Sequence, residues 1–438
     1  MITVVLSVYK VASFPDGGGH FWVYMQYAQG LRRLGCEVYW LEQLRPGGDP
    51  QREASLLATF FERMRQFGLD GKTLMYARDR PPEGGAGSLR FIGCSRSEVE
   101  AVLRRADVVL NFHYAIDPGL LACARRTALV DIDPGLLQFW MSTGQLAVPA
   151  HDRYLTTGET VGTPAARFPD CGLPWIHIRP PVCLDAWPVR YTPRAEAFTT
   201  VTSWSSASWL KVTVSGEIVL RDNTKRVSFL EFVDLPRHTS QPLELALYLL
   251  DRDPEGRARP HQADKDADDR VSLQQHGWRL RDSREVAGSP DAYRAYIQQS
   301  RGEFSCAKPS CMDLQNAWIS DRTVCYLASG KPVVVEDTGP SAYLPHGEGM
   351  FRFTSLAEAV EALGDINAHY ARHCSAAHDI AATYFDSKQV LERVLDAALG
   401  TGTEGQPPAA LATLPAPPQA AVSVPGDPTR SAAARPSS

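Results

Sequence analysis

The stretch YLASGKPVVVEDTG, residues 326–339, passes from the end of an apolar helix through a glycine turn into a short strand of valines. The strand ends in acidic and hydroxyl side chains. In an open parallel sheet, ligands bind beyond the carboxyl ends of the strands. We therefore expect Asp337 and Thr338 to face a ligand crevice, with Gly339 allowing the backbone to approach the ligand closely. A plain strand-to-helix turn capped by Thr338 explains the same residues equally well.

The length and composition predict a globular protein with more than one domain. A chain of 438 residues favours two domains of about 150 to 200 residues each plus a tail. With 44% hydrophobic residues and a net charge of −5, the chain offers no basic field for nucleic acid. Its nine cysteines contain no Cys-x-x-Cys pair, so neither a disulfide framework nor a zinc site is expected.

The two ends of the sequence bear on location and on order. The N-terminus has a short apolar run without a basic region before it, and no stretch approaches the roughly 18 apolar residues of a membrane span. We expect no transmembrane segment and a cytoplasmic location. Residues 401–438 contain no aromatic residue and many Pro, Ala and Ser, a composition that predicts a disordered tail.

The first half of the chain alternates between strand and helix patterns. Such alternation predicts a parallel, doubly wound sheet. Apolar positions at helical spacing follow the first strand. The expected strands cover 2–8, 36–42, 107–112 and 128–133, and the expected helices lie near 20–35, 52–67 and 96–105, with a short one from 117.

A second α/β half follows the proline-rich link at 178–197. We expect strands at 198–204, 243–250, 276–283, 302–307 and 332–337, and helices at 290–300, about 316–329, and through about 398. The highly charged piece 251–270 has no apolar face and reads as a surface loop. The expected domains are an N-terminal one at 1–180, a C-terminal one at 198–385, a helix at 386–400, and the tail.

Charged residues also gather one strand before the opening stretch. Glu303 and Lys308 lie at the end of the strand GEFSCA, and the next helix begins with Ser320, Asp321 and Arg322. Only eight of the 45 basic residues are lysines, and a compact ammonium at a strand exit suits a diphosphate. Surface salt bridges, Glu303 with Lys308 or Asp321 with Arg322, are the alternative.

The run GEFSCAKPSCMDLQNAWISDRTVCYLASGKPVVVEDTG resembles the donor-binding segment of GT-B glycosyltransferases, particularly bacterial group-1-like and CgeB-like ones. In that segment a Phe-Ser strand exit precedes a helix ending in Ala-x-Gly-x-Pro-Val, here residues 328–333. LNFHY, VDIDPG and YLTTGETVG in the first half also fit, so the resemblance covers nearly all of residues 1–400. It implies two Rossmann-like domains facing a cleft. Cys325 departs from the family pattern, because many members have there a Glu that holds the donor ribose; Asp321 or Glu303 would take that role.

The glycine run after the first strand is a candidate anion site. Gly17, Gly18 and Gly19 open the first helix, and such turns bind anions through backbone N–H groups. His20 follows directly, and in the GT-B resemblance its position is similar to that of the catalytic base of inverting members. A helix-capping role is the alternative.

Three further polar residues of the first half end expected strands. His113, Asp131 and Asp133 should therefore look into the cleft. A neutral imidazole can accept a hydroxyl proton, and a nearby carboxylate would stabilise its charged form. His113 could instead bind the sugar's hydroxyls, as the resemblance to retaining members implies, or be a satisfied buried histidine.

The sequence favours an α/β glycosyltransferase of the hexosyl type (EC 2.4) that moves a sugar from a nucleotide-diphosphate sugar to an unidentified acceptor. Lys308, Arg322 and the N–H groups around Thr338 and Gly339 would neutralise the departing diphosphate, so no metal or cofactor is expected. Three alternatives stay open: a nucleotide-sugar epimerase, a nicotinamide oxidoreductase using Gly17–Gly19 with Glu42 on the ribose, and a protein that binds a nucleotide sugar or a partner without turnover.

Overall fold

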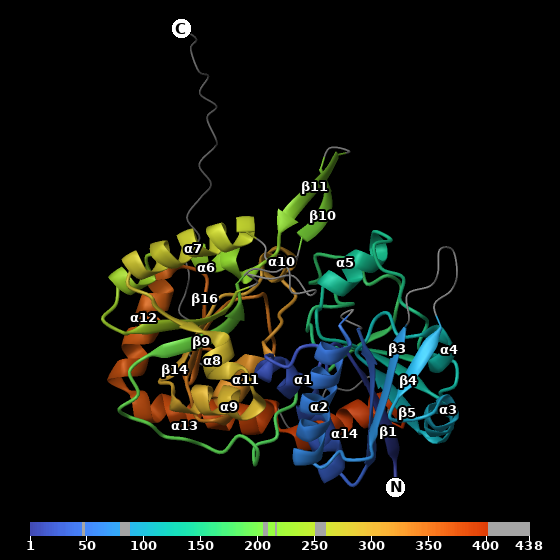
Figure 1. The fold of residues 1–438 in the computed structure, drawn as a ribbon. Helices are drawn as coiled ribbons and strands as arrows, with labels where there is room; N and C mark the ends of the chain where they lie inside the picture. Colours follow the sequence, from blue (N-terminus) through green and yellow to red (C-terminus); the bar gives the residue numbers. More distant parts are fainter. Residues whose placement is uncertain (46–48, 79–87, 205–208, 215–216, 250–259, 402–438) are drawn as a thin grey trace. The chain divides into compact units, whose positions relative to one another are not determined.

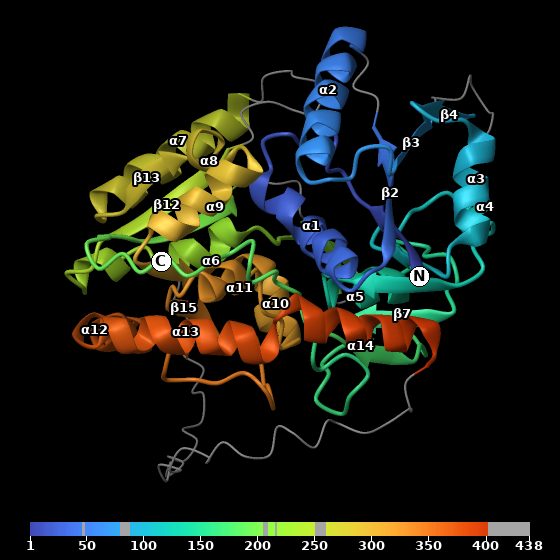
Figure 2. The same ribbon diagram turned by 90° about the horizontal axis from the view of Figure 1, so that it is seen from below.

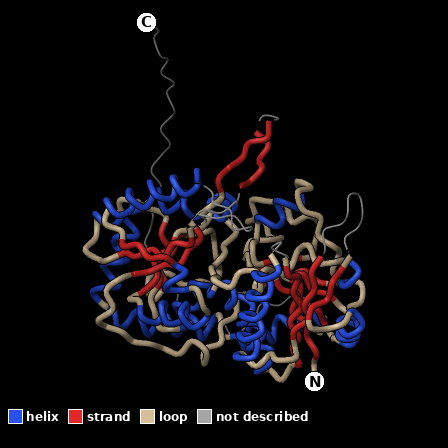
Figure 3. Tube along the Cα trace, viewed as in Figure 1, coloured by secondary structure: helices blue, strands red, loops and turns tan. Residues whose placement is uncertain are grey.

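The structure is a computed structural model that describes residues 1–45, 49–78, 88–204, 209–214, 217–249 and 260–401. Each half of the chain forms a mostly parallel sheet covered by helices (Figure 1, Figure 3). The α/β class expected from the alternating pattern is confirmed. The tail expected at 401–438 lies, from residue 402 on, outside the described residues.

The N-terminal sheet has the strand order β4-β3-β2-β1-β5-β6-β7-β8. All neighbours run parallel except β3 and β4. The order reverses between β1 and β5, which creates a switch point beyond the carboxyl ends of these strands. The strands are β1 Thr3–Val8, β2 Glu37–Leu44, β3 Thr73–Arg78, β4 Leu89–Ile92, β5 Val108–Asn111, β6 Thr127–Asp131, β7 Arg153–Thr156 and β8 Trp175–His177.

Five helices accompany this sheet, and side chains cap the first turns of α2, α3 and α4. Asp49 caps α2 through its side chain, and Ser95 and Glu98 form a reciprocal capping box on α3. The helices are α1 Gly18–Arg33, α2 Pro50–Gln66, α3 Arg96–Arg105, α4 Pro118–Leu121 and α5 Leu136–Ser142. The predicted strands and helices of this half are confirmed, whereas β3, β4, β7, β8 and α5 were not predicted.

The C-terminal sheet has the order β13-β12-β9-β14-β15-β16 and is parallel throughout. It has its own switch point between β9 and β14. A separate antiparallel hairpin joins β10 Trp209–Val214 to β11 Glu217–Asp222. The sheet strands are β9 Phe198–Ser203, β12 Leu243–Tyr248, β13 Arg279–Asp282, β14 Gly302–Ser305, β15 Val333–Glu336 and β16 Met350–Phe353.

The helices of this half are α6 Lys225–Glu231, a 3-10 turn η1 Leu235–Arg237, α7 Pro260–Gln275, α8 Ser283–Ala287, α9 Pro290–Gln299, α10 Pro309–Leu314, α11 Asp321–Ala328, α12 Leu356–Ala368, α13 Tyr370–Tyr384 and α14 Ser387–Leu399. The helix expected at 316–329 begins only at Asp321. Before it, Gln315 and Ala317 have positive φ angles of 51° and 52°, which interrupt the helical path.

The prediction of a surface loop at 251–270 is wrong for its described part. Residues 260–270 belong to α7, and 251–259 lie outside the described residues. The inward positions Asp266, Asp269 and Leu273 are 3%, 7% and 0% exposed. Asp269 accepts hydrogen bonds from Trp204 Nε1 at 2.9 Å and from the Arg226 guanidinium. The inward face of α7 therefore includes a buried carboxylate, where most helices bury apolar side chains.

The last helix leaves the C-terminal sheet and packs on α1, as Figure 2 shows. Val182 N–H donates to Phe385 O at 2.8 Å, and Ser387 N–H donates to Val182 O at 2.9 Å, which joins the link to the start of α14. A Cβ on Gly30 of α1 would lie 2.3 Å from Leu391 Cδ1 of α14. One hydrophobic cluster therefore includes side chains of β1, α1, α11 and α14.

The strands of the first sheet lie within residues 3–177 and those of the second within 198–353. The assignment of separate domains to 1–180 and 198–385, and of a distinct helix to 386–400, stays a prediction. None of the helices in the described ranges combines the length and the hydropathy that a membrane crossing requires.

Candidate active site

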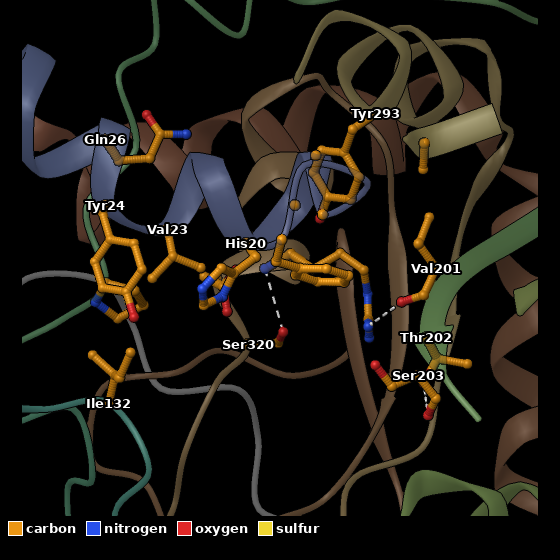
Figure 4. A pocket seen from close by; sticks show the side chains of 18 of the residues that line it. His20, Val23, Tyr24, Gln26, Ile132, Val201, Thr202, Ser203, Tyr293 and Ser320 are labelled. Carbon is orange, nitrogen blue, oxygen red and sulfur yellow. Dashed lines mark hydrogen bonds between the residues drawn. The ribbon is translucent and has the colours of Figure 1, made fainter. Parts of the chain in front are cut away.

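A cavity of about 470 Å³ lies where the carboxyl ends of strands from both sheets meet. The N-terminal sheet contributes the loops after β1 and β6 and the start of α1. The C-terminal sheet contributes the end of β9 and the starts of α6 and α11. Figure 4 shows His20, Val23 and Tyr24 of α1 opposite Val201, Thr202 and Ser203 of β9. Both switch points therefore open into one space.

The structure brings most of the predicted site residues to this cavity. Its lining includes Gly17, Gly18, Gly19, His20, Asp133, Lys308, Ser320, Asp321 and Arg322. Six predicted residues lie elsewhere: His113, Asp131, Glu303, Asp337, Thr338 and Gly339.

His20 has one ring nitrogen fixed by the backbone. Its Nε2 lies 2.7 Å from Tyr9 O, and because a carbonyl oxygen only accepts, Nε2 carries the proton. Nδ1 then holds a lone pair. Burial lowers the pKa of His20 below the usual 6.5, although the Tyr9 carbonyl and Asp133 oppose this shift. The imidazole is therefore neutral at pH 7 and able to accept a proton.

Asp133 and Lys308 join the two sheets across the cavity. Lys308 Nζ lies 3.5 Å from Asp133 Oδ1, and the Asp133 carboxylate raises the pKa of Lys308 above its ordinary value. Both side chains keep about a third or more of their surface exposed, 35% for Lys308 and 42% for Asp133. Lys308 thus remains charged and accessible to a ligand.

Arg322 lines the cavity, but its guanidinium is held by protein groups. Nε donates to Glu303 Oε1 at 2.6 Å, Nη1 donates to Val201 O at 2.8 Å, and Nη2 contacts Ser305 Oγ. Glu303 lies within β14, is 0% exposed and faces Arg322 rather than the cavity. The pair fixes β9, β14 and α11 relative to one another.

Ser320 and Asp321 form the start of α11 at the cavity wall. Ser320 Oγ accepts from Arg322 N–H at 3.3 Å and caps the helix. Burial raises the pKa of Asp321, which lies in the first turn. Behind them, Cys325 is 3% exposed, and its Sγ accepts from Gln26 Nε2 at 3.7 Å, so the thiol packs against α1.

The expectation that Asp131 faces the cleft is wrong. Asp131 is 0% exposed and accepts hydrogen bonds from Gln138 Nε2 and Thr156 Oγ1, both at 2.9 Å, and from Tyr114 Oη at 3.2 Å. Burial raises the pKa of Asp131 to about 6. Asp131 therefore organises the end of β6, and Asp133 alone of this pair reaches the cavity.

Asp337, Thr338 and Gly339 shape the loop before α11 instead of lining the cavity. Thr338 Oγ1 donates to Trp318 O at 2.6 Å, and Asp337 pairs with Arg352. Gly339 has a φ angle of 130°, and a Cβ there would lie 2.7 Å from Gln315 O. The glycine is thus required by the loop that carries Trp318, which does line the cavity.

Lys225 is a cavity residue that sequence reasoning missed. Its ammonium lies 5.9 Å from the Trp318 ring centroid and, among the described residues, has no hydrogen-bonded or ion-paired partner. Burial, together with Arg322 and Lys308, lowers the pKa of Lys225 to about 7. The only signal in the sequence was a rare lysine in DNTKR at the start of a helix.

The glycine run packs tightly against the second half of the chain. A Cβ on Gly18 would lie 2.3 Å from Ser289 O, and one on Gly19 would lie 2.8 Å from the Tyr293 ring.

Glu42, which the oxidoreductase alternative needs on a ribose, is 1% exposed and accepts from Ala12 N–H at 2.7 Å. Its carboxylate is thus engaged inside the protein.

His113 lines a neighbouring cavity of about 430 Å³ and is 4% exposed.

In the described part of the chain, no group of three His, Cys, Asp or Glu side chains is arranged to hold a metal ion. That the reaction needs no metal or cofactor stays a prediction.

Neither a family model nor a curated protein matches the sequence. Solved structures do resemble it in fold. HepE of Anabaena in complex with UDP-glucose has a TM-score of 0.55 at 10% identity, covering 90% of this chain and 99% of that one. An alpha-glucosyltransferase in complex with UDP-glucose and DNA containing an abasic site has a TM-score of 0.53 at 10% identity, covering 90% and 98%.

A glycosyltransferase from Rickettsia africae has a TM-score of 0.50 at 10% identity, covering 90% of this chain and 97% of that one. At such low identity these likenesses concern the fold. They confirm the expected arrangement of two Rossmann-like halves facing a cleft, the GT-B fold.

Proposed function

We propose that this chain with the GT-B fold is a glycosyltransferase that moves a sugar from a nucleotide-diphosphate sugar to an acceptor hydroxyl. The observation that carries the proposal is the meeting of Lys225, Lys308 and His20 in one cavity at both switch points. Two ammonium groups can pair with the negative charges of a diphosphate, and a neutral imidazole can accept the proton that an attacking hydroxyl loses.

The two lysines would hold the donor's diphosphate. Each is close enough to the other for Lys308 to lower the pKa of Lys225, and a diphosphate placed between them would relieve this repulsion. Negative charge grows on the diphosphate as it departs, so the lysines stabilise the transition state more than the bound donor. Because HepE and the alpha-glucosyltransferase were solved with UDP-glucose, we propose a UDP-hexose as donor.

His20 would act as the general base. The acceptor oxygen attacks the anomeric carbon while its proton passes to His20 Nδ1. The bond from that carbon to the diphosphate oxygen breaks, and its electron pair leaves with the diphosphate. Asp133 favours the resulting imidazolium, as its effect on the pKa of His20 indicates. This direct displacement inverts the anomeric configuration.

A thermal-shift series tests the proposal. We expect UDP to raise the melting temperature and UMP to raise it less, because UMP lacks the second phosphate. A ligand at 100 times its Kd stabilises a protein by about 2.7 kcal/mol, so a shift of several degrees is expected. If neither UDP, GDP nor dTDP shifts the transition, the donor site is absent.

Turnover separates transfer from the alternatives. Release of UDP from UDP-glucose should depend on an added acceptor. An epimerase would convert the nucleotide sugar without any acceptor, and a binding protein would show the thermal shift without product.

A further inference from the structure

The second cavity adjoins the first. It measures about 430 Å³, a size typical of sites for small organic molecules. Tyr9, Tyr24, Ile132 and Asp133 line both cavities. A molecule that fills the second cavity can therefore extend a hydroxyl across this boundary toward His20, whose Nε2 is bonded to Tyr9 O.

The walls of the second cavity are mainly aromatic. They include Tyr9, Tyr24, Phe112, Tyr114, Trp140 and Leu146. Two of the phenol groups are already engaged, since Tyr114 Oη donates to Asp131 Oδ1 at 3.2 Å and Tyr9 Oη accepts from Arg45 Nη2 at 2.7 Å. Such walls favour a flat apolar group, because aromatic rings pack by their faces and edges.

His113 adds an imidazole ring to this aromatic wall. Its ring lies 5.1 Å from the Tyr9 ring, and its buried Nδ1 has no hydrogen-bond partner among the described residues. Burial and Arg45 lower the pKa of His113 to about 4, so the ring is neutral. Because Nδ1 is closed off from solvent, the imidazole meets a ligand in this cavity as one more neutral ring of the aromatic wall.

Arg45 places positive charge on the lining of this cavity. It is exposed, and among the described residues it has no carboxylate partner. Its guanidinium carbon lies 5.0 Å from the centroid of the Tyr9 ring. Lys10 lies near enough for Arg45 to lower its pKa. The two cations would attract an anionic group of a ligand.

We propose that the second cavity binds the acceptor, and that this acceptor is a small aromatic alcohol or phenol carrying an anionic group. Its ring lies against the aromatic wall, its reacting hydroxyl crosses the boundary beside Asp133, and its anion contacts Arg45. The acceptor role rests on the proposed transferase function, whereas binding of the aromatic anion does not.

Three probes test the proposal on the full chain without nucleotide. Calorimetric titration compares para-hydroxyphenylacetate, its neutral analogue para-cresol, and maltose. We expect both aromatic probes to bind and maltose not to. Arg45→Gln should weaken para-hydroxyphenylacetate about tenfold and para-cresol less than about twofold, because a charge-assisted hydrogen bond is lost only for the anion. Arg96→Gln, an exposed arginine on α3, is the matched control and should change neither.

Filling the cavity gives a second readout. Leu146 is partly exposed, so Leu146→Trp should fold, and it should abolish binding of both aromatic probes. With UDP-glucose present, the wild-type chain should glucosylate para-hydroxyphenylacetate, and mass spectrometry would detect the product.

Each contrary result has a distinct meaning. Binding of maltose without the aromatic probes, or an equal loss for both aromatic probes in Arg45→Gln, overturns the proposal. If UDP raises the melting temperature but no aromatic probe binds, the acceptor class is wrong while the transferase function stands. If the aromatic probes bind but UDP does not, the transferase function fails and the acceptor role fails with it.

Discussion

Lys225 and Lys308 differ in the groups that surround them. Lys308 faces Asp133, whose negative charge raises the pKa of the lysine. Lys225 has no hydrogen-bonded or ion-paired partner among the described residues, and its pKa is lowered to about 7. A diphosphate would raise the pKa of Lys225, because an opposite charge favours the ammonium. Lys225 is therefore the cation whose state depends most on the ligand.

We expect Lys225→Gln to weaken UDP binding by at least about tenfold, since one charge-assisted contact is lost. In the wild type, affinity should fall as the pH rises through about 7, because the free ammonium then loses its proton and binding must restore it. Calorimetric titration between pH 6 and 9 measures both effects. Lys388→Gln, an exposed lysine on α14, should behave as wild type. A pH dependence that persists in Lys225→Gln would assign it to another group.

The pH dependence of turnover should report His20. The base must be neutral, and its pKa is lowered, so kcat should be constant around pH 7 and fall only below about pH 6.5. His20→Ala should reduce kcat by about 10²–10⁴-fold and remove this acid limb. The exposed His238 serves as a control through His238→Ala. An unchanged acid limb in His20→Ala would exclude His20 as the base.

Residue types at strand ends predicted the cavity in part. His20, Asp133, Lys308 and Asp321 were placed there from sequence, because loops after parallel strands share one edge of the sheet. Sequence could not distinguish Asp133 from Asp131, because the exact end of β6 decides the outcome: Asp131 is its last residue and is buried, whereas Asp133 lies in the loop beyond it. Arg322 and Glu303 were recognised as polar, but their mutual hydrogen bond depends on packing.

At the scale of elements, packing alone accounts for the glycine run at the start of α1, and its role as an anion site stays a prediction. Gly17, Gly18 and Gly19 line the cavity, and the first N–H groups of a helix have no partner within the helix. The close contacts of Gly18 and Gly19 with α8 and α9 equally require the absence of side chains. Because of this packing, the start of α1 would require glycines at positions 18 and 19 even if no ligand bound there.

We expect Gly18→Ala to lower the free energy of unfolding by about 1–3 kcal/mol, because its Cβ would clash with the backbone oxygens of Ala287 and Ser289. Gly364→Ala on α12 is the matched control. A Cβ there meets nothing within 4 Å, so the change should stabilise by about 0.5–1 kcal/mol. Urea denaturation measures both variants. Equal effects of the two changes would mean that Gly18 is not constrained by packing.

The strands and helices with clear periodicity were predictable, and α7 was not. Its buried positions 266, 269 and 273 have helical spacing, but two of them are aspartates, which hydrophobic periodicity cannot detect. Short strands such as β4 and β8 have four and three residues and no fully buried position, so their pattern is too brief to recognise.

At the scale of the whole described chain, α14 connects the two sheets. Leu391 is 0% exposed and belongs to the cluster that includes β1, α1 and α11. We expect Leu391→Ala to cost about 2–5 kcal/mol and to destabilise both halves together, because their cores are continuous. Urea unfolding monitored by far-ultraviolet circular dichroism and by tryptophan fluorescence should give one coincident transition. Two separate transitions, only one of them shifted by the variant, would show independent domains.

In the proposed site, a nucleotide diphosphate lies between the two halves, held by a lysine from α6 and a lysine after β14. A crystal structure of the chain with UDP would show whether it does. We expect diphosphate oxygens at hydrogen-bonding distances of about 2.7–3.2 Å from Lys225 Nζ and Lys308 Nζ. UDP bound on another face, or a cavity that stays empty at saturating UDP, would contradict it.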